Sequence, residues 1–109
     1  MLTWEEFEKV DMRVGTILTT EDFPEARNPS YKMTIDFGEI GIKKTSAQIT
    51  KLYTREELIG RQIIAVVNFS PKQIANFISE CLVLGIVSDD KEVILLSAER
   101  LAKNGLRIK

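Results

Sequence analysis

The sequence contains no histidine and only one cysteine, so it is short of the residues that most often transfer protons and bind metals. A single thiol offers neither a zinc-binding spacing nor an internal disulfide. There is no glycine-rich phosphate loop, and nothing beside Ser79-Glu80 supplies the base and oxyanion hole that a serine nucleophile needs. These absences argue against an enzyme, and they predict a chain that binds no metal and no cofactor.

The chain also lacks a basic-then-apolar leader at its start and any apolar run long enough to span a bilayer. Its one cysteine, Cys81, lies inside an apolar run, which suits a reducing compartment. A chain of 109 residues is the size of one domain. We therefore expect a single cytoplasmic domain, residues 1–109, that does not insert into a membrane.

Strong charge of one sign is missing as well, because the net charge is −1. This argues against a protein that works mainly on phosphate backbones. Between residues 40 and 77, however, six basic side chains outnumber two acidic ones. A modest positive centre and an ordinary solvated surface are both compatible with this distribution. The six basic residues are Lys43, Lys44, Lys51, Arg55, Arg61 and Lys72.

Two short apolar runs, residues 63–67 and 81–87, form the part around which the rest of the chain is arranged. Both are rich in β-branched residues, and Gly60 and Pro71 flank the first, so we predict two buried strands. The connection over residues 70–78 has apolar residues of its own and is expected to pack down on the domain.

Two short helices are predicted from capping boxes, in which Thr3 pairs with Glu6 and Thr54 pairs with Glu57. Each box opens a segment of one or two turns. A helix this short is not stable on its own at a chain end, so its apolar side must pack against another part of the protein or a partner.

The remaining strands are predicted from alternation and turn signals. Apolar and polar residues alternate over 31–37, residues 12–23 form a first strand with a bend at Gly15, and residues 40–50 give a third. A polar turn leads into residues 93–96, and Asn104-Gly105 marks a turn before a last short strand. Five strands with a small helix between the third and fourth predict an all-β, five-stranded OB-fold Greek-key barrel, with another small Greek-key barrel as the alternative.

A set of short motifs together covers nearly the whole chain. The motifs are Asn68-Phe69-Ser-Pro71, Ile74-Ala75-Asn-Phe77, Ser79-Glu80-Cys-Leu82-Val-Leu-Gly85, Asp11-Met-Arg-Val-Gly-Thr-Ile17, Phe23-Pro-Glu-Ala-Arg27, Ile35-Asp-Phe-Gly38, Gly41-Ile-Lys43 and Ser46-Ala-Gln-Ile-Thr-Lys51. In combination these motifs resemble the CsaA family of export-related chaperones of bacteria and archaea. CsaA is in turn similar to the tRNA-binding OB domain appended to some methionyl-tRNA synthetases.

The resemblance implies a homodimeric OB barrel that binds unfolded or precursor polypeptides in protein export, with the translocation motor SecA as a possible partner. For tRNA the match is poorer. Ala75-Asn76 stands where the synthetase-type domain has Arg-Gly, and Glu80 adds a negative charge, which weakens attraction to phosphates.

The first functional hypothesis is a chaperone with an apolar groove that holds a flexible peptide. The predicted peptide-binding residues are Gln48, Asn68, Phe69, Phe77, Ile78 and Ser79. Phe69 and Phe77 could instead belong to the core or to a dimer interface, and the Asn68 amide could simply bond to loop backbone groups.

The second hypothesis is a tRNA- or RNA-binding module in which cations contact phosphates and Tyr31 or Phe37 stacks on bases. The alternation of Tyr31 and Phe37 with apolar neighbours places both rings on the core face, which weighs against stacking. The predicted phosphate contacts are Lys43, Lys44, Arg61 and Lys72.

Homodimerisation is a separate prediction from the chain ends. The first helix and the tail each have an apolar side, and segments at chain ends can reach across a two-fold axis. The predicted interface residues are Trp4, Phe7, Leu101, Leu106 and Ile108.

Overall fold

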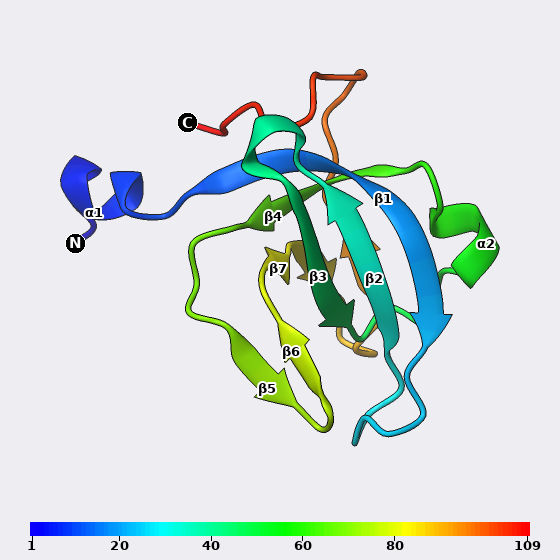
Figure 1. Ribbon diagram of the computed structural model, residues 1–109. Helices are drawn as coiled ribbons and strands as arrows, with labels where there is room; N and C mark the ends of the chain where they lie inside the picture. The colour runs from blue at the N-terminus through cyan, green and yellow to red at the C-terminus, as the bar shows by residue number, and fades with distance from the viewer.

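Strand β1 (Met12–Asp22) is the central strand of a five-stranded antiparallel sheet that curls into a nearly closed barrel (Figure 1). Its first half pairs with β4 (Gln62–Val66) and its second half with β2 (Tyr31–Asp36). Strand β3 (Ile42–Ala47) and strand β7 (Leu82–Val83) form the two edges of this sheet, in the order β3-β2-β1-β4-β7. The computed structural model describes residues 1–109, and it confirms the predicted OB-type barrel.

Two hairpins are attached to the barrel. The connection after β4 forms β5 (Lys72–Ile74) and β6 (Phe77–Ser79), which pair with each other at the lower side of the view in Figure 1. The chain after β7 forms β8 (Gly85–Val87) and β9 (Val93–Leu95). The prediction that the connection packs on the domain is confirmed, because β6 lies against β3.

The helices are short and begin where the capping boxes predict. Helix α1 spans Trp4–Glu8, helix α2 spans Arg55–Leu58 between β3 and β4, and a 3-10 turn, η1, spans Gly38–Ile40. Both boxes have their two reciprocal hydrogen bonds. With helices of five and four residues, the protein has no helix that could cross a membrane.

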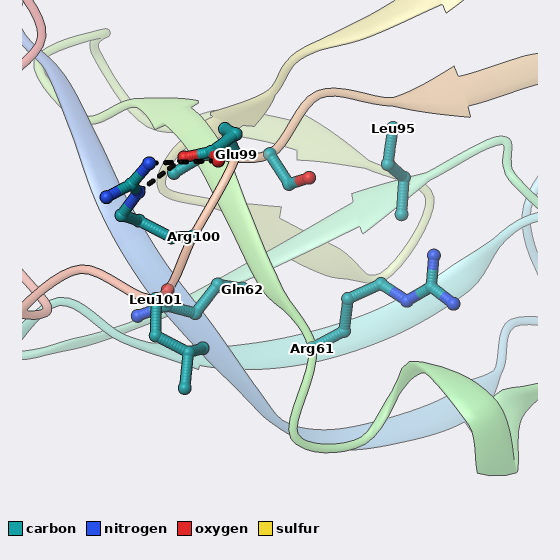
Figure 2. A pocket seen from close by; sticks show the side chains of 8 residues that line it. Arg61, Gln62, Leu95, Glu99, Arg100 and Leu101 are labelled. Atoms are coloured by element: carbon teal, nitrogen blue, oxygen red, sulfur yellow. Dashed lines mark hydrogen bonds and ion pairs between the residues drawn. The ribbon is translucent and has the colours of Figure 1, made fainter.

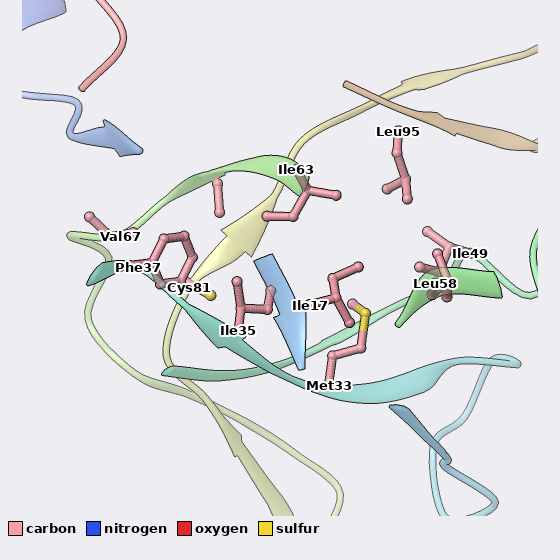
Figure 3. Packing of buried hydrophobic residues seen from close by; sticks show 11 residues of the cluster. Ile17, Met33, Ile35, Phe37, Ile49, Leu58, Ile63, Val67, Cys81 and Leu95 are labelled. Carbon is pink, nitrogen blue, oxygen red and sulfur yellow. The ribbon is translucent and has the colours of Figure 1, made fainter. Parts of the chain in front are cut away.

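The core fills the barrel interior with the alternate residues of β1, β2 and β4 (Figure 3). Met33, Ile35 and Phe37 are all buried, as the alternation predicts, and Leu58 is the one residue of α2 that reaches them. Gly15 on β1 lies directly over the Phe37 ring, where the absence of a side chain makes room for the aromatic group.

The run 81–87 differs from its prediction as a single buried strand. Its first part, β7, pairs with β4, but the chain then turns away and its second part, β8, pairs only with β9. Ile86 and Val87 are therefore 56% and 65% exposed. The apolar composition of the run does not reveal that its strand partner changes at Leu84.

The tail after residue 100 follows β1 without forming the predicted last strand, apart from one isolated bridge between Arg13 and Arg107. Its backbone is nevertheless bonded to β1: the Val14 N–H donates to the Leu106 carbonyl at 3.0 Å, and the Gly105 N–H donates to the Val14 carbonyl at 2.8 Å. The predicted Asn104-Gly105 turn is confirmed. This path brings the two chain ends to the same side of the barrel (Figure 1).

Candidate functional site

The barrel has a seam where its two edge strands, β3 and β7, approach each other without forming a continuous ladder. At one end the Glu80 N–H donates to the Lys44 carbonyl at 2.8 Å, and the Lys44 N–H donates to the Glu80 carboxylate at 2.9 Å. The buried Thr45 hydroxyl closes the same end through a 2.7 Å bond to the Cys81 carbonyl. Beyond these contacts the two strands are not paired.

A groove lies along this open part of the seam, formed by two adjoining cavities of about 280 and 690 Å³. Ser46, Ile74 and Leu82 line both cavities, so they mark the place where the two join. Aliphatic side chains supply most of the apolar wall, and Phe69 is its one aromatic ring. The apolar lining residues are Ala26, Ala47, Ile49, Phe69, Ile74, Leu82, Val83, Leu84, Val87 and Val93.

Three of the six predicted peptide-binding residues line this groove. Phe69 and Ser79 lie in the smaller cavity, and Gln48 lies in the larger one. Ser79 is buried, and its hydroxyl is bonded to the Thr45 hydroxyl at 2.9 Å, so it also helps to close the seam. Phe69 is 57% exposed and presents its ring to solvent at the groove.

Asn68 does not line the groove and instead bonds to the backbone that joins α1 to β1. Its side-chain oxygen accepts from the Asp11 N–H at 3.0 Å, and its side-chain nitrogen donates to the Lys9 carbonyl at 2.6 Å. This is the alternative considered for Asn68 from the sequence. The amide fixes the start of the loop that carries Phe69.

Phe77 and Ile78 also lie outside the groove lining, and as neighbours on β6 they point to opposite faces of the β5–β6 hairpin. The Phe77 ring packs edge-on against Phe23, with ring centroids 5.5 Å apart. Two lysine ammonium groups, of Lys32 and Lys44, lie 5.8 and 5.4 Å from its centroid. Phe77 therefore anchors the hairpin to the loop between β1 and β2.

Leu82 and Ile74 are groove residues that the sequence did not indicate. Leu82 is 49% exposed on an edge strand, although it stands in a run predicted to be buried. No periodicity in that run distinguishes a residue facing the core from one facing a cleft, because both positions are apolar.

The groove carries positive charge and no negative charge. Lys72 lines the smaller cavity, Arg27 and Lys91 line the larger one, and neither cavity is lined by an aspartate or a glutamate. Of the four predicted phosphate contacts, only Lys72 belongs to the groove. Lys43 and Lys44 lie on β3 outside its lining.

Arg61 lies in a separate cavity of about 400 Å³, beside Gln62, Leu95 and Leu101 (Figure 2). Its guanidinium lies over the Tyr53 ring, 5.0 Å from the centroid. The four cations are therefore not gathered on one surface.

Tyr31 and Phe37 are not available as stacking platforms on the free surface. Phe37 is completely buried, and the Tyr31 hydroxyl donates to the Tyr53 carbonyl at 2.7 Å. The sequence pattern had already placed both rings on the core side.

Cys81 sits at the floor of the smaller cavity but is not a nucleophile at neutral pH. Burial raises the pKa of its thiol to about 11, so the thiol remains protonated. No cluster of carboxylates and cysteine is arranged to hold a metal ion. The chemistry available in the groove is apolar contact, hydrogen bonding and attraction of negative charge.

A second apolar surface lies between α1 and the end of the tail. A cavity of about 510 Å³ there is lined by Trp4, Phe7 and Ile108, among others. Trp4 is 86% exposed, so this helix leaves its largest side chain without a partner inside the chain. Leu101 and Leu106 are exposed elsewhere along the tail.

Comparison with known proteins shows the family. The family described as "Putative tRNA binding domain" matches residues 12–107, from the first residue of β1 into the tail. The chain belongs to this family. The match includes the whole barrel and the groove, and the tRNA-binding domain is a binding module and not a catalytic one.

The curated relatives that match this chain are much longer proteins than the chain itself. It is 33% identical over 104 residues to the methionine–tRNA ligase of Bdellovibrio bacteriovorus and 37% identical over 106 residues to methionine–tRNA ligase 1 of Sorangium cellulosum. These alignments cover 95% and 97% of the chain but only 15% of each ligase.

Solved structures similar to this chain over its whole length include two chaperones. The chaperone CsaA of Bacillus anthracis is 50% identical, with a TM-score of 0.96, and covers 100% of this chain and 99% of its own. The CsaA chaperone of Picrophilus torridus is 53% identical, with a TM-score of 0.94 and complete coverage of both chains. The resemblance drawn from the sequence, to CsaA and to the synthetase domain, is confirmed.

Proposed function

We propose that this protein is a non-catalytic chaperone that binds unfolded or precursor polypeptides in its seam groove. The observation that carries the proposal is the lining of the groove, which is apolar and mostly aliphatic. Phe69 is its one aromatic ring. Aliphatic walls suit apolar peptide side chains, whereas single-stranded nucleic acid is held by aromatic rings that stack on successive bases. The similarity to two CsaA chaperones supports the same function.

The setting of this activity follows from the resemblance. We propose a cytoplasmic protein that acts in protein export, with SecA as a partner where that motor is present. Of the residues predicted from the sequence, Gln48, Phe69 and Ser79 are proposed to contact the peptide, and Asn68 to hold the Phe69 loop in place.

RNA binding is the second candidate function, and the family match to a tRNA-binding domain favours it. Lys72 at the groove and the lysines Lys43 and Lys44 on β3 would contact phosphates. Their separation from Arg61 limits the number of phosphates that the protein can neutralise at one time.

The two candidates are expected to respond differently to salt. Raising salt from about 50 mM to about 500 mM should reduce peptide affinity by less than tenfold but reduce RNA affinity by about 100-fold, for three phosphate contacts. Fluorescence anisotropy with an unfolded polypeptide and with a tRNA measures both. An RNA complex that is tighter than the peptide complex at high salt would contradict the chaperone proposal.

We also propose that the protein forms a homodimer through α1 and the tail. The wild-type chain is expected to sediment as a dimer at micromolar concentration, and Trp4→Asp as a monomer, because a carboxylate placed in an apolar interface is costly to desolvate. Ile59→Asp, at a 55% exposed position beside α2, is the matched control and should remain dimeric. Sedimentation velocity measures the oligomeric state of all three chains, and a monomeric wild-type chain would contradict the proposal.

A further inference from the structure

Strand β3 leaves the Ser46 N–H unpaired where it borders the groove, while the Ser46 carbonyl accepts only a long 3.4 Å bond from the Thr45 hydroxyl. The N–H and carbonyl of Lys44 both bond to Glu80, so they point away from β2. Because backbone direction alternates along a strand in an antiparallel pair, the N–H and carbonyl of Ser46 point the same way. A parallel ladder would continue by a bond from the Ser46 N–H to the Glu80 carbonyl, and that bond is not formed.

Strand β7 presents a matching free edge across the groove. The Leu84 N–H donates to the Ile64 carbonyl at 2.9 Å, so the N–H of Leu84 points toward β4. By the same alternation, the N–H and carbonyl of Val83 point away from β4. Since β7 is the last strand of the sheet, no strand pairs with this side of Val83.

Ser46 and Val83 both line the larger cavity, so the groove has backbone donors and acceptors on opposite walls. Exposed edge groups of this kind are a template for one more strand. An extended polypeptide is the ligand with a regular series of N–H and carbonyl groups that can bond to them. A nucleic acid has no such series.

The charge of the groove limits which polypeptides fit. Arg27, Lys72 and Lys91 are its charged lining residues, and all three are cations. Ligand carboxylates are therefore attracted and ligand lysines or arginines repelled, more strongly at low salt than at high salt. The aliphatic wall requires apolar side chains in the same segment.

We propose that the groove binds an extended polypeptide by strand addition at the open seam, with Ser46 and Val83 supplying backbone hydrogen bonds. It selects segments in which apolar side chains alternate with carboxylates. This inference rests on the proposed peptide-binding function and specifies its geometry and its preferred ligand.

The test uses the full chain and a probe peptide of about nine residues in which leucine alternates with aspartate and serine. Each backbone nitrogen of the peptide is methylated in turn, and affinity is measured by fluorescence anisotropy. Because an added strand turns successive N–H groups alternately toward β3 and β7, affinity should fall about three- to tenfold at the positions that face Ser46 or Val83 and change little at the two ends of the peptide.

Two further arms test the protein side and the charge preference. Ser46→Pro removes the Ser46 N–H, and proline is tolerated on edge strands, so peptide affinity should fall about three- to tenfold. Ser46→Ala keeps the N–H and is the matched control, with nearly wild-type affinity. Replacing the aspartates of the peptide by lysines should weaken binding about tenfold at low salt, and less at high salt.

The outcomes separate this inference from the proposed function. A methylation profile in which no position of the peptide is sensitive, or equal losses from Ser46→Pro and Ser46→Ala, would overturn strand addition while leaving peptide binding intact. Tighter binding of the lysine peptide would overturn the charge preference. If neither peptide binds and an RNA of about ten nucleotides does, the peptide-binding function itself is wrong.

Discussion

Replacing Gly15 by valine is expected to destabilise the protein more than any other single substitution considered for it. A Cβ atom at this position would lie 2.6 Å from the Phe37 ring and 2.7 Å from the Ile35 side chain. Both neighbours are completely buried, so neither can move into solvent. Overpacking a core costs about 1–3 kcal/mol or more, and a domain of this size has about 5–15 kcal/mol of stability in total.

We expect Gly15→Val to lower the free energy of unfolding by at least about 3 kcal/mol, and Gly15→Ala by about half as much. The melting temperature of the valine variant should fall by more than about 10 °C. Chemical denaturation followed by circular dichroism measures both variants. Gly15→Val should also weaken peptide binding, because Phe37 holds β2 in place and the neighbouring strand β3 forms one wall of the groove.

A double-mutant cycle identifies the cause of this loss. Phe37→Leu removes part of the ring that a side chain at Gly15 would strike, so it should cost less in the Gly15→Ala background than in the wild-type chain. If the losses of unfolding free energy in the two single variants simply add up in the double variant, Gly15 is required for another reason, such as backbone bending of β1 at this point.

The sequence predicted most of the barrel because its elements are specified locally. The alternation over residues 31–37 places one face of β2 in the core, and the capping boxes at Thr3 and Thr54 fix where both helices begin. Gly15 was recognised as a special position in β1. These features depend on neighbours in the chain, which a single sequence displays.

The groove was harder to predict because it depends on contacts between distant segments. A continuous apolar run, residues 81–87, contains a core residue, groove residues and exposed residues, since the chain exchanges one strand partner for another within it. The roles of Asn68 and Phe77 likewise depend on Lys9 and Phe23, which are far away in the sequence. Side-chain type alone did not separate a lining residue from an anchoring one.

Leu82→Asp is expected to weaken peptide binding strongly while leaving the fold intact. Leu82 lies where the two cavities join and is half exposed, so a carboxylate there remains hydrated in the free protein. On binding, the carboxylate would lose its water against apolar peptide side chains, and the contact with the leucine would also be lost. Together these terms should raise the dissociation constant by about 10- to 100-fold.

Ile86→Asp is the matched control, because Ile86 is 56% exposed on the neighbouring strand β8 and does not line the groove. It introduces the same charge into the same apolar run and should change peptide affinity by less than about twofold. Both variants should melt within a few degrees of the wild-type chain. Equal losses of affinity in the two variants would mean that the exposed β8–β9 hairpin, and not the seam groove, holds the peptide. The pair therefore locates the binding surface, because the two substitutions differ in whether the residue faces the seam.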